Sequence, residues 1–184
     1  KVVYNPSNVF SKQLYAKNIL LEQNGYVQNL FEFEMVNSIV VDGANKKWVG
    51  TSKAGVFLIS ENGTEQILNF DEDNSPLLSN QINTITMDKE SGEVYFGTTA
   101  GIISYRGNAT EGAANYNDYL VFPNPVREDY TGVITVKVLM ENSFCKVVDA
   151  SGFLLWQGYA NGGTLTWNGK DFNGKRPATG VYFV

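Results

Sequence analysis

Four basic side chains could bind an anionic group in this acidic chain. They are Arg127, Lys170, Lys175 and Arg176, and the chain carries a net charge of −5. Guanidinium and ammonium groups form short, charge-assisted hydrogen bonds with phosphate oxygens. If the loops that carry them converge, these residues would form a patch for the phosphate of an anionic glycan. The alternative is that they only keep the surface soluble.

Two segments have spacings that approach known ion and phosphate sites. Residues 169–175 fit the GxxxxGK part of a phosphate-binding loop, but Arg176 follows where magnesium binding needs Ser or Thr. Residues 71–75 offer carboxylate and amide oxygens to calcium, but Pro76 stands where a calcium-binding hand loop needs Gly. Both segments are therefore predicted to be loops between strands, without a bound metal or cofactor.

The residue types that the chain lacks exclude most catalytic chemistry. There is no His and one Cys among 184 residues. This removes the Ser-His-Asp triad, the Cys-His pair, His-based metal sites and an internal disulfide. We therefore expect a protein that is not an enzyme. Five acidic residues could in principle supply a glycosidase pair, although the sequence fixes no separation between them: Glu32, Glu34, Asp42, Asp88 and Glu90.

Composition narrows the class of protein further. The residues are 43% hydrophobic and 13% aromatic and include 18 Gly, which is typical of a folded protein rich in strands and tight turns. A negative net charge argues against nucleic-acid binding, because that needs clustered Lys and Arg. No run of about 18 apolar residues is present, so we expect no transmembrane segment.

An internal repeat organises the middle of the chain. The spacing between its two copies changes twice, by one residue each time. Both changes fall in turns, where a structural repeat tolerates an inserted residue. A period in the mid-forties made of short strands is typical of β-propeller blades; the alternative is a generic β-meander with chance similarity. Three pairs of segments align, at spacings of 46, 47 and 46 residues: 36–42 with 82–88, 48–51 with 95–98, and 54–57 with 100–103.

Turn residues between the apolar segments place the strands of each copy. The second copy lacks a fourth strand, as expected for a last blade that an N-terminal strand completes. Asp42 and Asp88 end equivalent strands, where each carboxylate should accept a hydrogen bond from the amide two residues on. The expected strands lie near 36–42, 46–51, 55–60 and 65–70 in the first copy, and near 82–88, 93–98 and 101–106 in the second.

Two pairs of equivalent residues should lie where neighbouring blades meet. Gly50 and Gly97 follow the aromatic residue of each copy, and the missing side chain would let the blades approach closely. Trp48 and Tyr95 share one repeat position and are expected to pack between blades.

The flanks of the repeat suggest a fragment of a larger ring. Residues 1–35 are interpreted as the remnant of a preceding blade or an edge segment, and residues 107–119 as a polar linker. Two or three blades cannot close a ring of about four to eight, so residues 36–106 are expected to be the C-terminal edge of a propeller. The chain starts at Lys1 and stops in the apolar segment 180–184, so we expect residues to be missing from both ends.

A second series of short strands occupies residues 120–184. Cys145, Trp156 and Trp167 are expected in its core. Short strands separated by turns every eight to twelve residues indicate an immunoglobulin-like β-sandwich. The predicted fold class is therefore all-β, a partial β-propeller of two to three blades followed by a sandwich. The expected strands begin near Val121, Val133, Cys145, Phe153, Gly163 and Gly180.

Several motifs resemble known families. Residues 74–85, with the downstream Asp, aromatic residue and Gly-Thr, resemble the two-component-regulator propeller repeat of extracellular proteins in Bacteroidetes-type bacteria. The second domain resembles the C-terminal domain of type IX secretion proteins, and a related tail occurs in flagellar hook-capping proteins. The family domain continues for another turn and strand. The motifs that carry this second resemblance are Pro123-Asn124-Pro125, Asp149 to Gly152, Trp167 to Gly174, and Gly180-Val181-Tyr182.

Taken together, residues 36–184 resemble the PorZ-type accessory proteins of the type IX secretion system. The resemblance implies a non-catalytic scaffold or ligand-delivery component at the bacterial cell surface, associated with the outer membrane. It also implies PorU-, PorV- and PorQ-like partners and an anionic lipopolysaccharide ligand. One alternative is a secreted cargo protein with a type A C-terminal sorting domain. Another is the ectodomain of a two-component sensor, which would place a membrane span where this chain has a sandwich.

Overall fold

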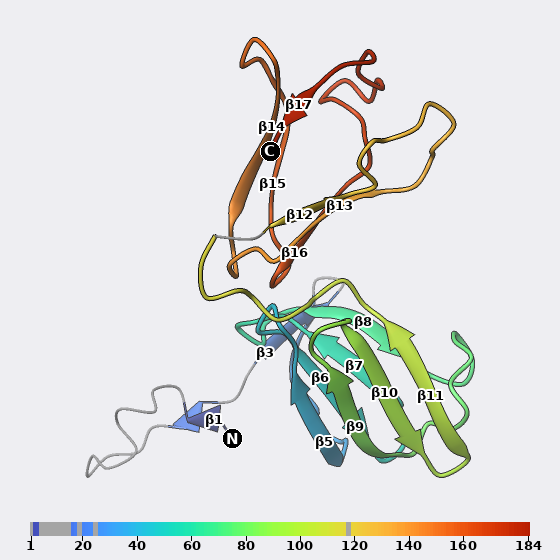
Figure 1. The fold of residues 1–184 in the computed structure, drawn as a ribbon. Helices are drawn as coiled ribbons and strands as arrows, with labels where there is room; N and C mark the ends of the chain where they lie inside the picture. The colour runs from blue at the N-terminus through green and yellow to red at the C-terminus, as the bar shows by residue number, and fades with distance from the viewer. Residues whose placement is uncertain (1, 4–15, 18–19, 24–25, 117–118) are drawn as a thin grey trace. The chain divides into compact units, whose positions relative to one another are not determined.

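In the computed structural model every regular element is a β-strand. The structure describes residues 2–3, 16–17, 20–23, 26–116 and 119–184, and these contain no helix (Figure 1). The prediction of an all-β fold is confirmed. Within the same residues there is accordingly no helix that could cross a membrane. Contacts divide the chain into two compact units: Lys1–Val41, Asn45–Met87 and Val94–Tyr105 form the first, and Asp42–Ala44, Asp88–Glu93 and Arg106–Val184 form the second.

The first 35 residues contain two short antiparallel pairs. β1 (Val2–Val3) pairs with β2 (Ala16–Lys17), and β3 (Leu20–Gln23) pairs with β4 (Tyr26–Asn29). Much of the segment that we interpreted as the remnant of a preceding blade lies outside the described residues.

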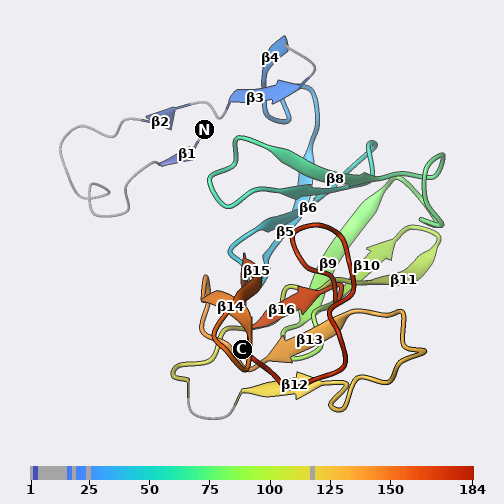
Figure 2. The same cartoon turned by 90° about the horizontal axis from the view of Figure 1, so that it is seen from above.

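The two copies of the repeat form two separate antiparallel sheets (Figures 1 and 2). Their strands fall where the turn chemistry predicted them, within one or two residues at each end. The first sheet has the order β5-β6-β7-β8, and the second has the order β11-β10-β9 with β11 as an edge strand. The strands are β5 (Val36–Val41), β6 (Lys47–Thr51), β7 (Val56–Ile59), β8 (Gln66–Phe70), β9 (Ile82–Asp88), β10 (Glu93–Thr98) and β11 (Gly101–Arg106).

Equivalent side chains close the turns of both copies. Asp42 accepts a hydrogen bond from the amide of Ala44 at 2.9 Å, and Asp88 accepts one from Glu90 at 3.1 Å, which confirms the predicted turn-capping role. The hydroxyl of Thr51 donates to the carbonyl of Gly55, and that of Thr98 donates to Gly101, both at 2.9 Å. The second turn is one residue shorter than the first, and this explains the return of the spacing from 47 to 46 residues.

The core of the first unit lies between the sheets β5–β8 and β9–β11. Cross-strand pairing places Val40, Trp48, Leu58 and Leu68 in one row on one face of the first sheet, because directly paired residues share a face. Side chains from both sheets, together with Leu77 from the segment between β8 and β9, complete this core. They are Val56, Phe70, Leu77, Ile82, Ile85, Met87, Val94, Phe96, Ile103 and Tyr105.

Trp48 and Tyr95, which occupy the same repeat position, differ in burial. Trp48 is 2% exposed, and its ring centroid lies 5.6 Å from those of Phe96 and Tyr105, so its predicted role between sheets is confirmed. Tyr95 is 36% exposed, and for this residue packing between blades stays a prediction. In the described part of the chain, no further sheet covers the face of the second sheet that carries Tyr95.

Gly50 allows the close approach that was predicted. A Cβ atom on Gly50 would lie 2.5 Å from Cγ2 of Ile82, which begins β9 at one edge of the other sheet. At Gly97 the nearest atom would be Cγ2 of Thr84 at 2.7 Å, on a strand of the same sheet. Only Gly50 therefore lies at a contact between sheets.

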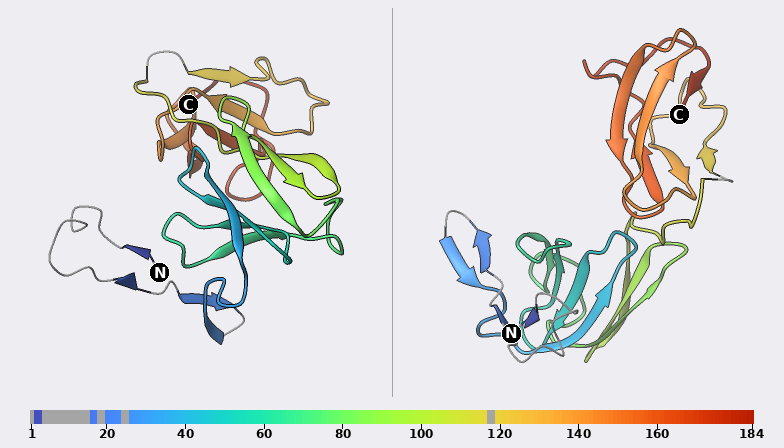
Figure 3. Two further views of the ribbon diagram at one scale, coloured as in Figure 1. Left: turned by 90° about the horizontal axis from the view of Figure 1, so that it is seen from below. Right: turned by 90° about the vertical axis from the view of Figure 1, so that its left-hand side faces the viewer.

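Two three-stranded antiparallel sheets form the second unit (Figure 3). One has the order β12-β13-β16 and the other β15-β14-β17. The predicted strand over 180–184 is reduced to two residues, whereas the one near 153–156 continues to Tyr159. The strands are β12 (Leu120–Phe122), β13 (Ile134–Lys137), β14 (Phe144–Asp149), β15 (Leu154–Tyr159), β16 (Thr164–Trp167) and β17 (Tyr182–Phe183).

Side chains from both sheets meet in the core of the second unit. Cys145 is half-buried against Val136 and Leu165, as predicted, and burial raises the pKa of its thiol. Trp156 and Trp167 lie with their ring centroids 6.3 Å apart and contact this core. Both tryptophans are therefore packing residues, as the sequence suggested.

The segment predicted to be a polar linker is held by main-chain hydrogen bonds. The amide of Glu111 donates to the carbonyl of Lys89 at 2.9 Å, and the amide of Ala113 donates to Leu139 at 2.8 Å. Thr110 is 7% exposed and its hydroxyl lies 2.6 Å from that of Thr164. Residues 107–113 are thus part of the packed second unit and do not behave as an exposed tether.

The turn after β14 is expected to make the stability of the fold sensitive to acid. Hydrogen bonds from the hydroxyl of Ser151 and then from the amide of Phe153 hold the pKa of Asp149 below its usual 3.8. A carboxyl group whose pKa is lower in the folded than in the unfolded state stabilises the fold at pH values above its unfolded pKa. This stabilisation is lost as the pH falls through the folded pKa. Asp149→Asn should therefore lower the free energy of unfolding at neutral pH and reduce its further decrease in acid.

Urea unfolding between about pH 7 and pH 2 would measure this effect, since the folded pKa lies below the ordinary range. Glu128→Gln is the control, because Glu128 is an exposed carboxyl in the same unit. If Asp149→Asn kept the full acid dependence of the parent protein, the turn would not be its source.

Candidate functional site

The loop that resembles a phosphate-binding motif is closed by its own aspartate. A carboxylate oxygen of Asp171 accepts hydrogen bonds from the amides of Asn173 and Lys175, each at 2.9 Å. The amide of Lys170 donates to the side chain of Asn168. These amides are therefore already used within the loop, and no helix follows it to supply others. The prediction of a strand-connecting loop is confirmed.

The carboxylate of Asp171 is stabilised in its charged form. The hydrogen bond from the amide of Lys175 is the largest cause, and it lowers the pKa of Asp171 below the usual range. The nearby ammonium group of Lys175 contributes to the same effect. Asp171 thus partly neutralises one of the four predicted basic residues.

Arg176 joins this loop to the segment that follows β12. One terminal nitrogen of its guanidinium group donates to the carbonyl of Tyr130 at 2.7 Å, and the other donates to the carbonyl of Arg127 at 2.9 Å. The structure therefore brings Arg127 and Arg176 together across nearly 50 residues of sequence. Lys170 and Lys175 are exposed on the loop that leads to Arg176.

A surface cavity of about 360 Å³ lies in the segment that Arg176 holds. Arg127 contributes a positive charge to its wall and Asp129 a negative one, while the ring of Tyr130 supplies apolar surface. The hydroxyl of Tyr130 donates to the carbonyl of Val133 at 2.9 Å and closes the loop. The other lining residues are Pro123, Pro125, Thr131 and Gly132.

Sequence reasoning missed most of this cavity. The Pro-Asn-Pro motif at 123–125 was used only for its resemblance to a family motif, and neither Asp129 nor Tyr130 was singled out. A signal was present, because the charged and aromatic residues 127–130 come shortly after two prolines, and loops on a rigid scaffold often carry binding residues. The contact with Arg176 had no local signal.

The hydrogen bonds of Arg176 lead to a prediction about this loop. Arg176→Ala should speed amide hydrogen exchange in residues 127–133 by about tenfold, the effect of losing roughly 1.4 kcal/mol of local stability. Lys175→Ala is the control, because it removes an exposed side chain from the same loop. Equal exchange rates in the two variants would mean that Arg176 does not hold the loop.

The other acidic candidates are used as turn caps. A carboxylate oxygen of Asp71 accepts hydrogen bonds from the amides of Asp73 and Asn74, and Glu72 accepts one from Asn80. Among the described residues, no group of three His, Cys, Asp or Glu side chains could hold a metal. The calcium hypothesis for residues 71–75 therefore has no support from the geometry.

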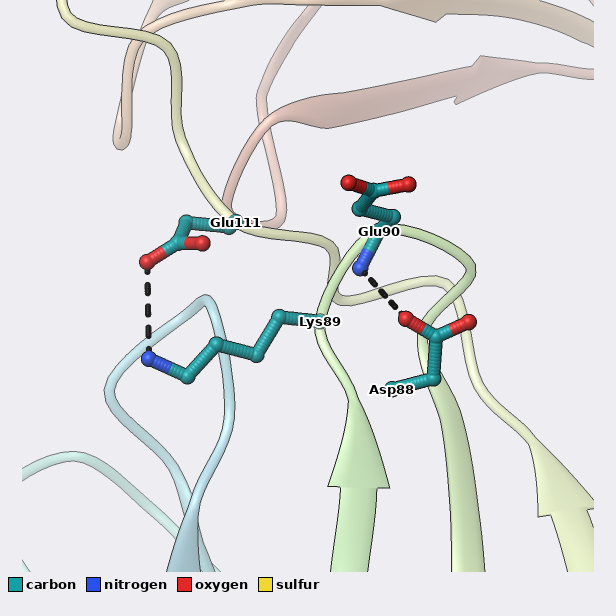
Figure 4. A network of polar contacts seen from close by, with 4 residues as sticks. All are labelled: Asp88, Lys89, Glu90 and Glu111. Atoms are coloured by element: carbon teal, nitrogen blue, oxygen red, sulfur yellow. Dashed lines mark hydrogen bonds and ion pairs between the residues drawn. The ribbon is translucent and has the colours of Figure 1, made fainter.

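Figure 4 shows that Asp88 and Glu90 belong to the turn that precedes β10. Asp88 accepts hydrogen bonds from the hydroxyl of Ser91 and the amide of Glu90, and the bond from Ser91 is the main reason that its pKa is lowered. Lys89 pairs with Glu111 at 3.4 Å, with both side chains exposed. An exposed pair of this kind adds little to stability.

The other acidic residues considered for a glycosidase pair lie in separate environments. Glu32 accepts a hydrogen bond from Asn29 at 3.0 Å, and Asp42 is buried at its turn. One carboxylate oxygen of Glu34 is buried without a hydrogen-bond partner among the described residues. Nothing in this geometry pairs two of these carboxylates across a cavity.

A comparison with solved structures supplies the functional context. The chain is similar to PorZ, an essential bacterial surface component of the type IX secretion system of Porphyromonas gingivalis. The two are 31% identical, with a TM-score of 0.60, and the match covers 98% of this chain. It covers 24% of PorZ, so the chain spans about a quarter of the length of that protein. No family model and no curated protein matches the sequence.

Proposed function

We propose that this chain is part of a non-catalytic scaffold or ligand-delivery component of a type IX secretion and attachment complex. The observation that carries the proposal is the similarity to PorZ in both sequence and fold over nearly the whole chain. The bacterial surface is the corresponding location, in association with the outer membrane. PorU-, PorV- and PorQ-like subunits would be its partners.

The proposed architecture follows the two repeats and the strand series after them. The sheets β5–β8 and β9–β11 are two consecutive propeller blades over residues 36–106, and residues 1–35 belong to a preceding blade. Residues 107–119 connect them to an immunoglobulin-like domain of the sorting type over 120–184. The equivalent hydrogen bonds of Thr51 and Thr98, and the packing of one sheet on the other, support this interpretation.

The cavity beside Arg127 is the proposed site for an anionic ligand. Arg127 lines it, Arg176 holds the segment that forms it, and Lys170 and Lys175 are exposed on the loop before Arg176. Together these four side chains can pair with the phosphate groups of an anionic lipopolysaccharide. Because these would be contacts between exposed opposite charges, binding should weaken with added salt.

A chimera tests the proposed role. The matched quarter of PorZ would be replaced by this chain in Porphyromonas gingivalis, and attachment of secreted cargo to the cell surface would be measured. Retained attachment and co-purification with the secretion subunits are expected. A chimera that lacks residues 120–184 should release cargo unattached. If removal of residues 120–184 left attachment normal, the scaffold role would be wrong.

The ligand site is tested in the same chimera by reversing charge. The double variant Lys170→Glu and Lys175→Glu should lower binding of purified anionic lipopolysaccharide by about tenfold, since each exposed charge contributes a few tenths to 1 kcal/mol. Lys53→Glu, an exposed change in the first unit, is the matched control. Equal binding by all variants would contradict the site while leaving the scaffold proposal intact.

The cargo alternative gives a different result. A cargo protein would lose its sorting domain on export, and mass spectrometry of the mature surface protein would detect cleavage before residue 120. The hydrogen bonds that hold residues 107–113 favour a retained domain, because proteases cut extended, exposed segments most readily.

A further inference from the structure

Several Asn-Gly pairs occur in the chain, and one of them differs from the others in its surroundings. The pairs in the described residues begin at Asn62, Asn161, Asn168 and Asn173, and a further pair at Asn24 lies outside them. The main-chain nitrogen of the following residue can attack an Asn side chain, and glycine hinders this attack least because it has no side chain. The reaction is intramolecular, so its rate depends on how the two groups are held. The environment of each pair therefore decides which Asn reacts.

In three of the described pairs the attacking nitrogen is hydrogen-bonded or enclosed. The amides of Gly63 and Gly174 each donate to the carbonyl three residues earlier, at 3.0 Å. Gly162 is buried, and a Cβ atom there would lie 2.0 Å from the carbonyl oxygen of Thr110. Each of these nitrogens must lose a hydrogen bond or move against packed main chain before it can reach the preceding Asn side chain.

The pair of Asn168 and Gly169 lacks these restraints. Asn168 is exposed on the loop after β16, and among the described residues the amide of Gly169 has no hydrogen-bond acceptor. Apart from chain neighbours, the one described atom within 4 Å of a Cβ atom at Gly169 would be Cδ1 of Ile134, at 3.7 Å. The nitrogen of Gly169 is therefore neither bonded nor crowded.

The carboxamide of Asn168 is also held and polarised. Its Oδ1 accepts a hydrogen bond from the amide of Lys170 at 3.1 Å, which fixes the side chain against its own main chain. Negative charge develops on this oxygen when a nitrogen adds to the carboxamide carbon. A donor that already points at the oxygen stabilises such an intermediate.

We propose that Asn168 is a site of spontaneous deamidation. The nitrogen of Gly169 gives its proton to water and bonds to Cγ of Asn168, the bond from Cγ to Nδ2 breaks, and Nδ2 takes up a proton and leaves as ammonia. The cyclic imide that remains takes up a water molecule, which breaks one of the two bonds from its nitrogen to a carbonyl carbon. Breaking the bond to Cγ gives aspartate, and breaking the other gives isoaspartate, whose main chain runs through the former side chain.

Both products change the loop that carries three of the basic residues. Each adds a carboxylate two residues before Lys170 and lowers the positive charge of residues 168–176. Isoaspartate also adds a carbon atom to the main chain and displaces Lys170, whose carbonyl accepts the indole N–H of Trp167 at 2.8 Å. Trp167 is 7% exposed, so this N–H would be left unpaired in the core. Weaker binding of an anionic ligand is a further consequence, which rests on the proposed function.

The complete 184-residue chain would be incubated in mildly alkaline buffer, digested in acid and examined by tandem mass spectrometry. Exchange of the amide for a carboxyl group raises the mass of the fragment and identifies the residue. Asn173 is the matched comparison, because Gly-Lys follows both Asn168 and Asn173. In the folded chain Asn168 should react at least about fivefold faster than Asn173, the factor that one net hydrogen bond on the attacking nitrogen represents.

A parallel incubation in concentrated urea separates the loop from its local sequence. Unfolding removes the hydrogen bond of Gly174, so the two rates should become equal. Equal rates in the folded chain, or a difference that urea leaves unchanged, would overturn the proposal.

Asn168→Gln provides the control for the assignment. It keeps a carboxamide but places it one carbon farther from the nitrogen of Gly169, so the mass change of this fragment should be lost. The same mass change in Asn168→Gln would place the modification at another residue. Mass spectrometry thus decides the proposal whether or not this loop binds lipopolysaccharide.

Discussion

Trp48→Ala is expected to lower the free energy of unfolding of the first unit by about 3–5 kcal/mol, the range for removing a large aromatic side chain from a core. Trp48 is 2% exposed and lies against the rings of Phe70, Phe96 and Tyr105. Two of these rings belong to the second sheet, so the substitution would remove packing contacts that join the two sheets. Native-state hydrogen exchange of β6 and β10 would assign the loss to this unit.

Tyr95→Ala is the matched control, because Tyr95 stands at the same position of the other repeat and is 36% exposed. We expect it to cost less than about 1.5 kcal/mol, as is usual outside a packed core. Similar losses in Trp48→Ala and Tyr95→Ala would show that the contact between the sheets does not determine the stability of this unit.

Gly50→Ala is expected to lower the free energy of unfolding by roughly 2–3 kcal/mol, which is typical of overpacking. The added Cβ atom would lie 2.5 Å from Cγ2 and 3.0 Å from Cβ of Ile82, and 3.2 Å from Cδ1 of Ile85. Ile82 is fully buried and Ile85 is 5% exposed, so neither side chain has room to move. Denaturant unfolding followed by far-ultraviolet circular dichroism would measure the change.

Gly97→Ala provides the comparison at the equivalent position. Its Cβ atom would lie 2.7 Å from Cγ2 of Thr84, and the next nearest atom is 3.5 Å away. Thr84 is exposed and can rotate, and alanine restricts the unfolded chain more than glycine does. We therefore expect little loss or a small gain. A larger loss in Gly97→Ala than in Gly50→Ala would contradict the assigned contact between sheets.

The candidate site could be predicted from the sequence only in part. Arg127 and Arg176 were chosen by charge, and the structure connects them through main-chain carbonyls. Asp129 and Tyr130 were missed, because nothing local indicates that residues 123–132 enclose a cavity. The contribution of Asp171, which accepts the amides of its own loop, was also missed, although an aspartate two residues before an Asn-Gly pair is a recognisable turn signal.

What the sequence by itself determined is the set of strands and turns of the repeat. Alternating apolar residues and turn residues such as Asp42 and Asp88 act over a few positions, so their pattern can be detected without tertiary information. Only the tertiary structure decided which of two equivalent residues is buried. Trp48 is covered because a second sheet packs on it, whereas Tyr95 is 36% exposed and no sheet of the described residues packs on its face. Burial depends on surfaces that distant segments provide, and local sequence carries no record of them.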